Sequence, residues 1–342
     1  MDEKTKKKWA NFQEENEGRP LTSYIKQKEN SNIIELTNSK KCPFLNESKL
    51  CNLVTQFGEE VLSKTCTIFP REVKEFENRM EYSLVPCCPE VIDILNKQKK
   101  VTFTEFYTGD DLAALREFMI TLIQDDTYTI SKSMMMLFFL LLDLYDKGEG
   151  SVKVFLRSKP ELLLEELIDA IDQMEFSKIN TFDENNELFL DLIQNYRKEG
   201  LYSDYLEEIA EEAEEFSEGY EEEVILKKLE EFEKQFKQYE PLFRKYLAVE
   251  FFNDLVVPES DLWSVVVMFQ WITLEYAMIR HAIFLTWMLD ASEEIPYQAV
   301  RDAIVILSRM TGYEAEDIYE YLENCFEEII WDWGYLALLV GI

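Results

Sequence analysis

A long apolar stretch in the last third of the chain, residues 262–289, reads LWSVVVMFQWITLEYAMIRHAIFLTWML. A membrane-spanning helix needs about 20 nearly uncharged residues, but this stretch contains Glu275, Arg280 and His281. We therefore expect a helix buried in the core of a soluble protein rather than a membrane span. The apolar run at residues 134–142 is too short to span a membrane and is expected to be a second buried helix.

Signals for helices continue through most of the chain after residue 100. Asp110 and Ser131 are N-cap candidates ahead of apolar runs, and Pro160 stands at a first-turn position. The chain has 10 glycines and 9 prolines in 342 residues. Together these are about half of the ~12% of residues that glycine and proline form in an average protein. Turn-rich β architectures need more of both, so we expect a mostly α protein. Further predicted helices cover residues 111–124, 132–146, 161–174, 184–197, 224–248 and 296–310.

The composition of the N-terminal part differs from that of the rest. Five of the six cysteines fall between residues 41 and 90, together with four prolines that imply turns between short elements. The chain also exceeds the ~250–300 residues at which a single core usually stops growing. We therefore expect two domains: a small cysteine-rich metal-binding domain over residues 1–100, packed on a larger α-helical domain over residues 101–342.

The charge balance limits the partners of this protein. There are 35 Lys and Arg against 68 Asp and Glu, a net charge of −33, so the field repels phosphate backbones and anionic lipids. We expect neither nucleic acid nor a membrane as partner, but lysine-rich protein patches, amines, sulfonium compounds or metal ions. The acidic stretch at residues 207–223 is either a solvated helix face or a steering surface for a basic partner. The N-terminus has no secretory signal core, which predicts a cytoplasmic location.

The clustered cysteines are the clearest candidates for chemistry. Thiols stay reduced in the cytosol, so clustering favours metal ligands over disulfides, and four thiolates in a tetrahedron suit Zn²⁺ or an iron–sulfur cluster. Their spacing differs from the two close pairs of a zinc finger, and a set of unconnected buried thiols is the alternative. The sixth cysteine, Cys325, lies on the apolar side of a predicted helix and is expected in the core.

Four segments around these cysteines carry a family resemblance. Residues 42–51 read CPFLNESKLC, residues 57–62 read FGEEVL, residues 66–71 read CTIFPR, and residues 83–90 read SLVPCCPE. Together they resemble the cysteine signature of the flagellin lysine-N-methylase family, which is related to a wider group of zinc- or iron-chelating domains. Weaker similarity in the later helices extends the resemblance over roughly residues 30–342.

The resemblance implies a protein-lysine N-methyltransferase that transfers methyl groups from S-adenosylmethionine to flagellin or another lysine-bearing protein. It also implies that the cysteines hold an iron–sulfur cluster, with zinc as the alternative metal. Carried onto this sequence, the ligand candidates are Cys42, Cys51, Cys66 and Cys88, and Cys87 is an extra thiol beside the matching position.

Two departures from the family pattern concern the cluster. The family's first cysteine group, which ends in Cys-Cys and is followed by Gly-Trp, is absent here, and Thr67 stands where the family commonly has arginine. If the chain is a shortened member, we expect the coding region upstream of Met1 to encode that group. The alternative function is a non-catalytic, metal-stabilised acidic helical protein that binds a basic protein partner.

Methyl transfer to lysine requires a neutral amine and a site for a sulfonium. Aromatic faces and carboxylates provide such a site, although core packing is the alternative role for each such side chain. No Gly-x-Gly-x-x-Gly loop follows a strand, which argues against a Rossmann methyltransferase. The single histidine, His281, is expected to be a hydrogen-bonded core residue rather than a base. The candidates are Trp263, Trp271, Glu275, Tyr276, Trp287, Trp331 and Trp333.

Overall fold

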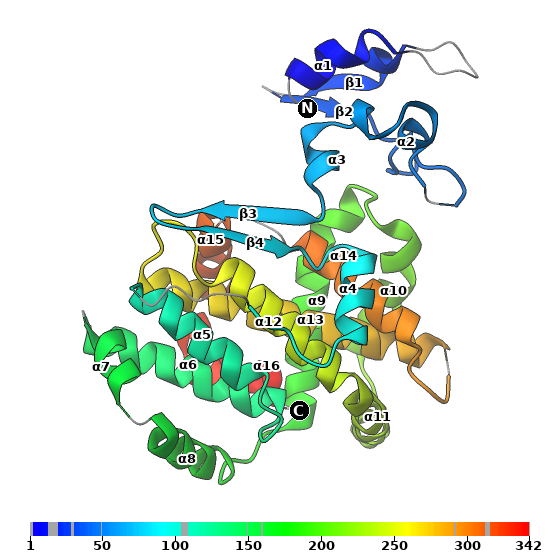
Figure 1. Cartoon of the computed structure of the whole chain (residues 1–342). Coiled ribbons are helices and arrows are strands. Elements are labelled where there is room, and N and C mark those ends of the chain that lie inside the picture. The colour runs from blue at the N-terminus through cyan, green and yellow to red at the C-terminus, as the bar shows by residue number, and fades with distance from the viewer. Residues whose placement is uncertain are drawn as a thin grey trace. The chain divides into compact units, whose positions relative to one another are not determined.

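The structure, a computed structural model, divides into two compact units (Figure 1). The smaller unit comprises residues 1–72 and 195–204, and the larger unit comprises residues 73–194 and 205–342. The division falls before residue 73 rather than at residue 100, because the helix at residues 89–97 packs on later helices of the larger unit. The structure describes residues 3–12, 20–28, 31–48, 50–103, 109–148, 150–158, 160–290, 292–311 and 315–341.

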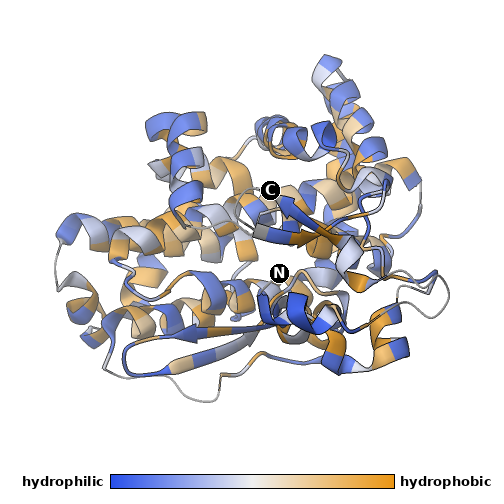
Figure 2. Cartoon of the chain, turned by 90° about the horizontal axis from the view of Figure 1, so that it is seen from above, coloured by the Kyte–Doolittle hydropathy of each residue, from blue (hydrophilic) through white to orange (hydrophobic). Residues whose placement is uncertain are grey.

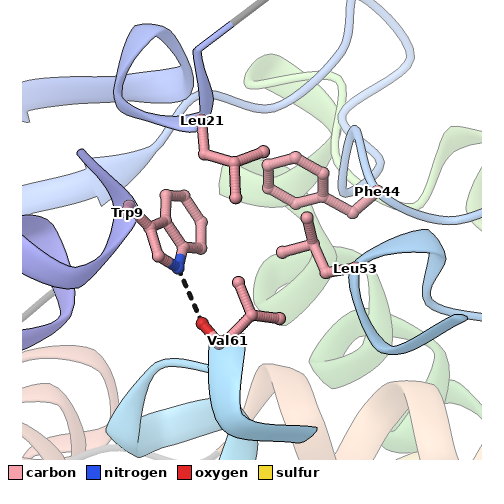
Figure 3. Packing of buried hydrophobic residues seen from close by; sticks show 5 residues of the cluster. All are labelled: Trp9, Leu21, Phe44, Leu53 and Val61. Atoms are coloured by element: carbon pink, nitrogen blue, oxygen red, sulfur yellow. Dashed lines mark hydrogen bonds between the residues drawn. The ribbon is translucent and has the colours of Figure 1, made fainter. Parts of the chain in front are cut away.

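The smaller unit consists of short elements around a small apolar cluster. Trp9, Leu21, Phe44, Leu53 and Val61 form this cluster (Figure 3). The indole Nε1 of Trp9 donates a hydrogen bond to the carbonyl of Val61 at 2.7 Å, and the rings of Trp9 and Phe44 meet edge to face with centroids 5.5 Å apart. The elements are α1 (Glu3–Trp9), η1 (Leu21–Tyr24), β1 (Ile25–Lys28), β2 (Ser31–Ile34), α2 (Asn52–Phe57), η2 (Glu59–Val61) and α3 (Lys64–Ile68).

The only described sheet of the smaller unit is the antiparallel pair β1–β2, in which Ile25 lies opposite Ile34 and Gln27 opposite Asn32. A two-stranded sheet is marginal by itself in water. The folded state of this unit therefore depends on the packing of the loops at residues 35–63 around the apolar cluster.

The larger unit is predominantly helical, which confirms the mostly α fold expected from the sequence. A two-stranded sheet, β3–β4, precedes the helices. Its elements are β3 (Arg71–Glu75), β4 (Met80–Leu84), α4 (Pro89–Lys97), α5 (Asp111–Ile123), α6 (Ile130–Lys147), α7 (Ser151–Arg157), α8 (Pro160–Ile171), α9 (Lys178–Lys198), α10 (Ser203–Glu218), α11 (Glu222–Phe236), η3 (Lys237–Tyr239), α12 (Glu240–Asp254), α13 (Leu262–Asp290), α14 (Tyr297–Met310), α15 (Ala315–Phe326), η4 (Glu327–Trp331) and α16 (Trp333–Val340).

The helix starts show which local signals were reliable. Asp110 caps α5 by accepting hydrogen bonds from the backbone nitrogens of Leu112 and Ala113, as predicted, and α8 begins at Pro160. The N-cap of α6 is Thr129 and not Ser131, because the apolar Ile130 already belongs to the buried helix.

Helix α13 is the centre of the larger unit, packed against α6, α12, α14, α15 and α16. Of the described helices it alone is long and apolar enough to cross a membrane by length and composition, but 78% of its most apolar window is buried inside the protein. A helix that is apolar all round belongs in a core, so the prediction of a buried helix at residues 262–289 is confirmed. The outer helices alternate hydrophobic and hydrophilic residues, as Figure 2 shows in orange and blue.

Candidate functional site

Three of the four predicted metal ligands belong to the smaller unit. Cys42 and Cys51 are partly buried against its apolar cluster, and Cys66 is an exposed residue of α3. Burial raises the pKa of the Cys42 thiol, the backbone of Phe44 lowers it, and the nearby Cys51 and Cys66 thiols raise it further. Cys51 and Cys66 therefore lie within electrostatic range of Cys42.

The fourth predicted ligand, Cys88, lies in the larger unit. It is buried at the N-cap position of α4, and Cys87 beside it is half-buried. Within the described residues, no three His, Cys, Asp or Glu side chains form a group able to hold a metal ion. The four-ligand site therefore stays a prediction. Cys325 was expected in the core but is exposed, because it lies at the end of α15, about one turn beyond the last buried side chain, Leu322.

A buried carboxylate, Glu275, lies in the middle of α13. The hydroxyls of Tyr246 on α12 and Thr311 after α14 both donate hydrogen bonds to it. Burial raises the pKa of Glu275 to about 7, although both hydrogen bonds lower it. Glu250 lies nearby on α12, and burial together with the charge of Glu275 raises its pKa well above the usual range. The two carboxylates are therefore coupled, and burial favours the protonated form of each.

Only Glu275 of this buried group was a candidate from the sequence. Tyr246, Glu250 and Thr311 were missed because each lies on a different element from Glu275. A sequence signal exists for Glu250, since it is the single charged residue in the apolar run LAVEFF at residues 247–252. A charged side chain inside such a run has to be buried with a partner or a proton.

Most of the candidate tryptophans have structural roles. The indole nitrogens of Trp271, Trp287 and Trp333 donate hydrogen bonds to the backbone carbonyls of Thr311, Ser292 and Met135, at 3.0, 2.9 and 2.8 Å. The Trp331 indole donates to Glu323 at 3.2 Å and its ring packs on that of Trp263. These contacts fix the positions of helices, as the core-packing alternative predicts.

The single histidine is a core residue, as expected. His281 Nε2 lies 2.9 Å from Oδ1 of Asn186, and burial lowers the pKa of the imidazole to about 3. A ring that stays neutral and hydrogen-bonded between phenylalanines cannot exchange protons with a substrate near pH 7.

A cavity of about 420 Å³ lies on another side of α13 from Glu275, within the larger unit. It is lined by residues 126–131, which form the end of the α5–α6 loop and the start of α6, by the end of α11, by Lys237 of η3, and by the start of α12. Tyr276 and Arg280 line it from α13. Of the aromatic residues named from the sequence, Tyr276 alone belongs to this lining.

Arg244 on α12 fixes the loop wall of this cavity. Its guanidinium donates hydrogen bonds to the carbonyls of Ile123 at 3.0 Å, of Asp125 at 2.8 Å and of Tyr128. Three carbonyls bonded by one buried guanidinium hold the end of α5 and the following loop in one conformation. The wall is therefore set by contacts more than 100 residues apart in sequence, which no local motif reveals.

The fold defines a helical protein outside the Rossmann class, since the described strands form only two-stranded sheets. A family model described as the FliB lysine N-methylase C-terminal domain matches residues 116–339. That is more than half of the chain, and the chain belongs to this family.

Two curated relatives are similar to shorter parts of the chain. A lysine-N-methylase from Salmonella typhimurium is 38% identical over 65 residues, which are 19% of this chain and 16% of that protein. The flagellar biosynthetic protein FliU from Salmonella muenchen is 43% identical over 78 residues, which are 22% of this chain and 46% of that protein. The matches thus span less than half of either relative. No solved structure matches the chain.

Proposed function

We propose that this chain transfers methyl groups from S-adenosylmethionine to lysine side chains of flagellin or a similar protein. The observation that carries the proposal is the lysine N-methylase family match, which extends from α5 to α16. The relatives named as a lysine-N-methylase and as a flagellar biosynthetic protein support the reaction and the substrate.

The transfer forms a bond from the lysine nitrogen to the methyl carbon while the carbon–sulfur electrons return to sulfur, so the amine must first lose a proton. A carboxylate near the incoming amine can take that proton. Glu275 is enclosed by Tyr246 and Thr311, whereas Asp126 lines the 420 Å³ cavity. Asp126 forms no ion pair with any residue that the structure describes. The cavity thus suits the reaction better than the buried carboxylate.

The cysteines are assigned in the same proposal to an iron–sulfur cluster, with zinc as the alternative, held by Cys42, Cys51, Cys66 and Cys88. The presence of the first three thiols in one unit, with Cys51 and Cys66 within electrostatic range of Cys42, supports this assignment. A thiolate-bound metal supplies a cross-link between loops that have little core of their own.

Incubation of the full chain with S-adenosylmethionine and flagellin from the same cell tests the reaction. The expected result is the addition of steps of about 14 Da to flagellin lysines, seen by peptide mass spectrometry. Flagellin whose lysines are already acetylated is the matched control and has to remain unmodified. Absence of methylation with metal-loaded protein would contradict the proposal.

The alternative, a non-catalytic partner of a basic protein, has one observation in its favour. Helix α10 buries Leu206, Ile209, Ala210 and Ala213 and exposes a row of glutamates. A solvated helix face accounts for this pattern equally. Salt-sensitive binding of flagellin without methylation would favour the alternative.

A further inference from the structure

The cavity beside Tyr276 has an arginine without an acidic partner. Within the described residues, no carboxylate forms an ion pair with Arg280, whose guanidinium lies 5.7 and 5.5 Å from the ring centroids of Phe232 and Phe236. This is notable in a chain of net charge −33. Glu233 lines the same cavity but is bonded through both oxygens to Lys178, at 2.9 and 3.0 Å. Arg280 is thus available to a carboxylate from outside the chain.

The rest of the lining supplies complementary chemistry. Phe236 and Tyr276 are buried aromatic residues of the lining, and the Tyr276 hydroxyl has no hydrogen-bond partner among the described residues. Glu240, at the start of α12, adds a carboxylate near this hydroxyl. A volume of about 420 Å³ falls within the ~300–1,000 Å³ of small-molecule sites. Apart from Glu233 and Arg244, which have partners within the chain, the cavity offers two cations, Lys237 and Arg280, two carboxylates, Asp126 and Glu240, and aromatic faces.

We infer that this cavity is the S-adenosylmethionine site, with Arg280 binding the carboxylate of the methionine part, Glu240 its ammonium group, and Tyr276 and Phe236 the adenine ring. The inference rests on the proposed function, since methyl transfer calls for this ligand. Its own basis is chemical complementarity. The ligand joins a zwitterionic amino acid to a flat base, and the lining has Arg280 and Glu240 for the two charges and aromatic rings for the base. The Arg244 bonds to the loop at residues 123–128 keep the site formed before the ligand enters.

Calorimetric titration of the full chain with S-adenosylhomocysteine, the stable product of the donor, tests the site without catalysis. Arg280→Gln should weaken binding roughly 10- to 100-fold, the usual effect of losing a charge-assisted hydrogen bond. Tyr276→Leu should also weaken it, whereas Tyr276→Phe retains the ring and should bind close to wild type. Arg157→Gln, which removes an exposed arginine of α7, is the charge-matched control and should have no effect.

Fragments of the ligand separate the two halves of the site. Binding of adenosine alone should be weakened by Tyr276→Leu but not by Arg280→Gln. Binding of methionine alone should be weakened by Arg280→Gln but not by Tyr276→Leu. A melting temperature close to that of wild type has to accompany each result, which is expected for Arg280→Gln because this arginine forms no ion pair with any described residue.

The outcomes also separate this inference from the proposed function. Binding that depends on Arg280 without methylation of flagellin would support the site while contradicting the proposed reaction. Methylation with unchanged binding in Arg280→Gln and Tyr276→Leu would place the donor elsewhere and overturn the site. Absence of S-adenosylhomocysteine binding by wild-type protein would also overturn it.

Discussion

The two units of this chain are stabilised in different ways. The smaller unit has about 80 residues and an apolar cluster of five buried side chains, a size at which a single core rarely supplies more than ~3–5 kcal/mol. The larger unit buries most of α13 among other helices. The smaller unit contains three of the four predicted ligand thiols, and the larger contains the cavity and most of the family match. A unit with little core needs a cross-link, which is the physical argument for the metal.

Loss of a thiol should have the largest effect and should be confined to the smaller unit. Cys42→Ser removes a predicted ligand, and since metal affinity is folding free energy in small metal-dependent units, residues 3–12 and 20–28 should lose hydrogen-exchange protection. Metal content should fall together with it, whereas α13 should remain protected. Cys325→Ser, at an exposed position on α15, is the control and should change neither quantity. Fresh anaerobic protein without iron, sulfide or zinc would contradict the prediction.

Core truncation should then distinguish the two units. Phe269 on α13 is fully buried and packs near Phe138 and Phe251, so Phe269→Ala should destabilise the larger unit by about 3–5 kcal/mol. Phe44→Ala should abolish protection of the smaller unit and leave α13 protected. Denaturant unfolding followed by hydrogen exchange measures both. Equal loss of protection in both units from either variant would show that they unfold as one.

The pH dependence of the larger unit should reveal Glu275. Its pKa of about 7 lies above the ordinary value of 4.5, so the folded state holds the proton more tightly, and this stabilisation, present below pH 4.5, is lost as the pH rises through 7. The loss should reach roughly 3 kcal/mol. Glu275→Gln should reduce this slope, to which the coupled Glu250 also contributes. The difference from wild type reports the pair of carboxylates, because His281 contributes equally to both proteins.

Unfolding free energies measured from pH 5 to pH 8 check this prediction. Glu211→Gln, an exposed position on α10, is the matched control and should retain the wild-type slope. An unchanged slope in Glu275→Gln would show that the carboxylate is not the titrating group.

The smallest effect is expected at an exposed ion pair within the smaller unit. Lys41 Nζ lies 2.7 Å from Oδ2 of Asp204, and both side chains are largely exposed. Exposed pairs contribute little and are screened by salt. Asp204→Asn should therefore leave the melting temperature of the smaller unit nearly unchanged, and any difference should vanish at 0.5 M salt. A large shift would mean that this contact holds residues 195–204 to the unit.

The sequence was sufficient where the cause is local. The apolar period of residues 262–289 predicts a buried helix, and the Asp110 side chain predicts a helix start, because both depend on neighbouring residues. It failed at Cys325, which has the helical spacing of a buried position but is exposed at the end of α15. The cavity could not be predicted, since Arg244 joins α12 to carbonyls more than 100 residues earlier. Such pairings leave no pattern in a single sequence.

The burial of α13 also has a consequence for synthesis on the ribosome. Its apolar surface is covered in part by α14 and α16, whose residues 297–310 and 333–340 are made after it. During translation this 29-residue helix therefore emerges with much of its surface in water, which favours aggregation or capture by chaperones. Slower elongation after residue 290 would prolong that exposure, so the yield of soluble protein should depend on translation speed over the last 50 or so codons.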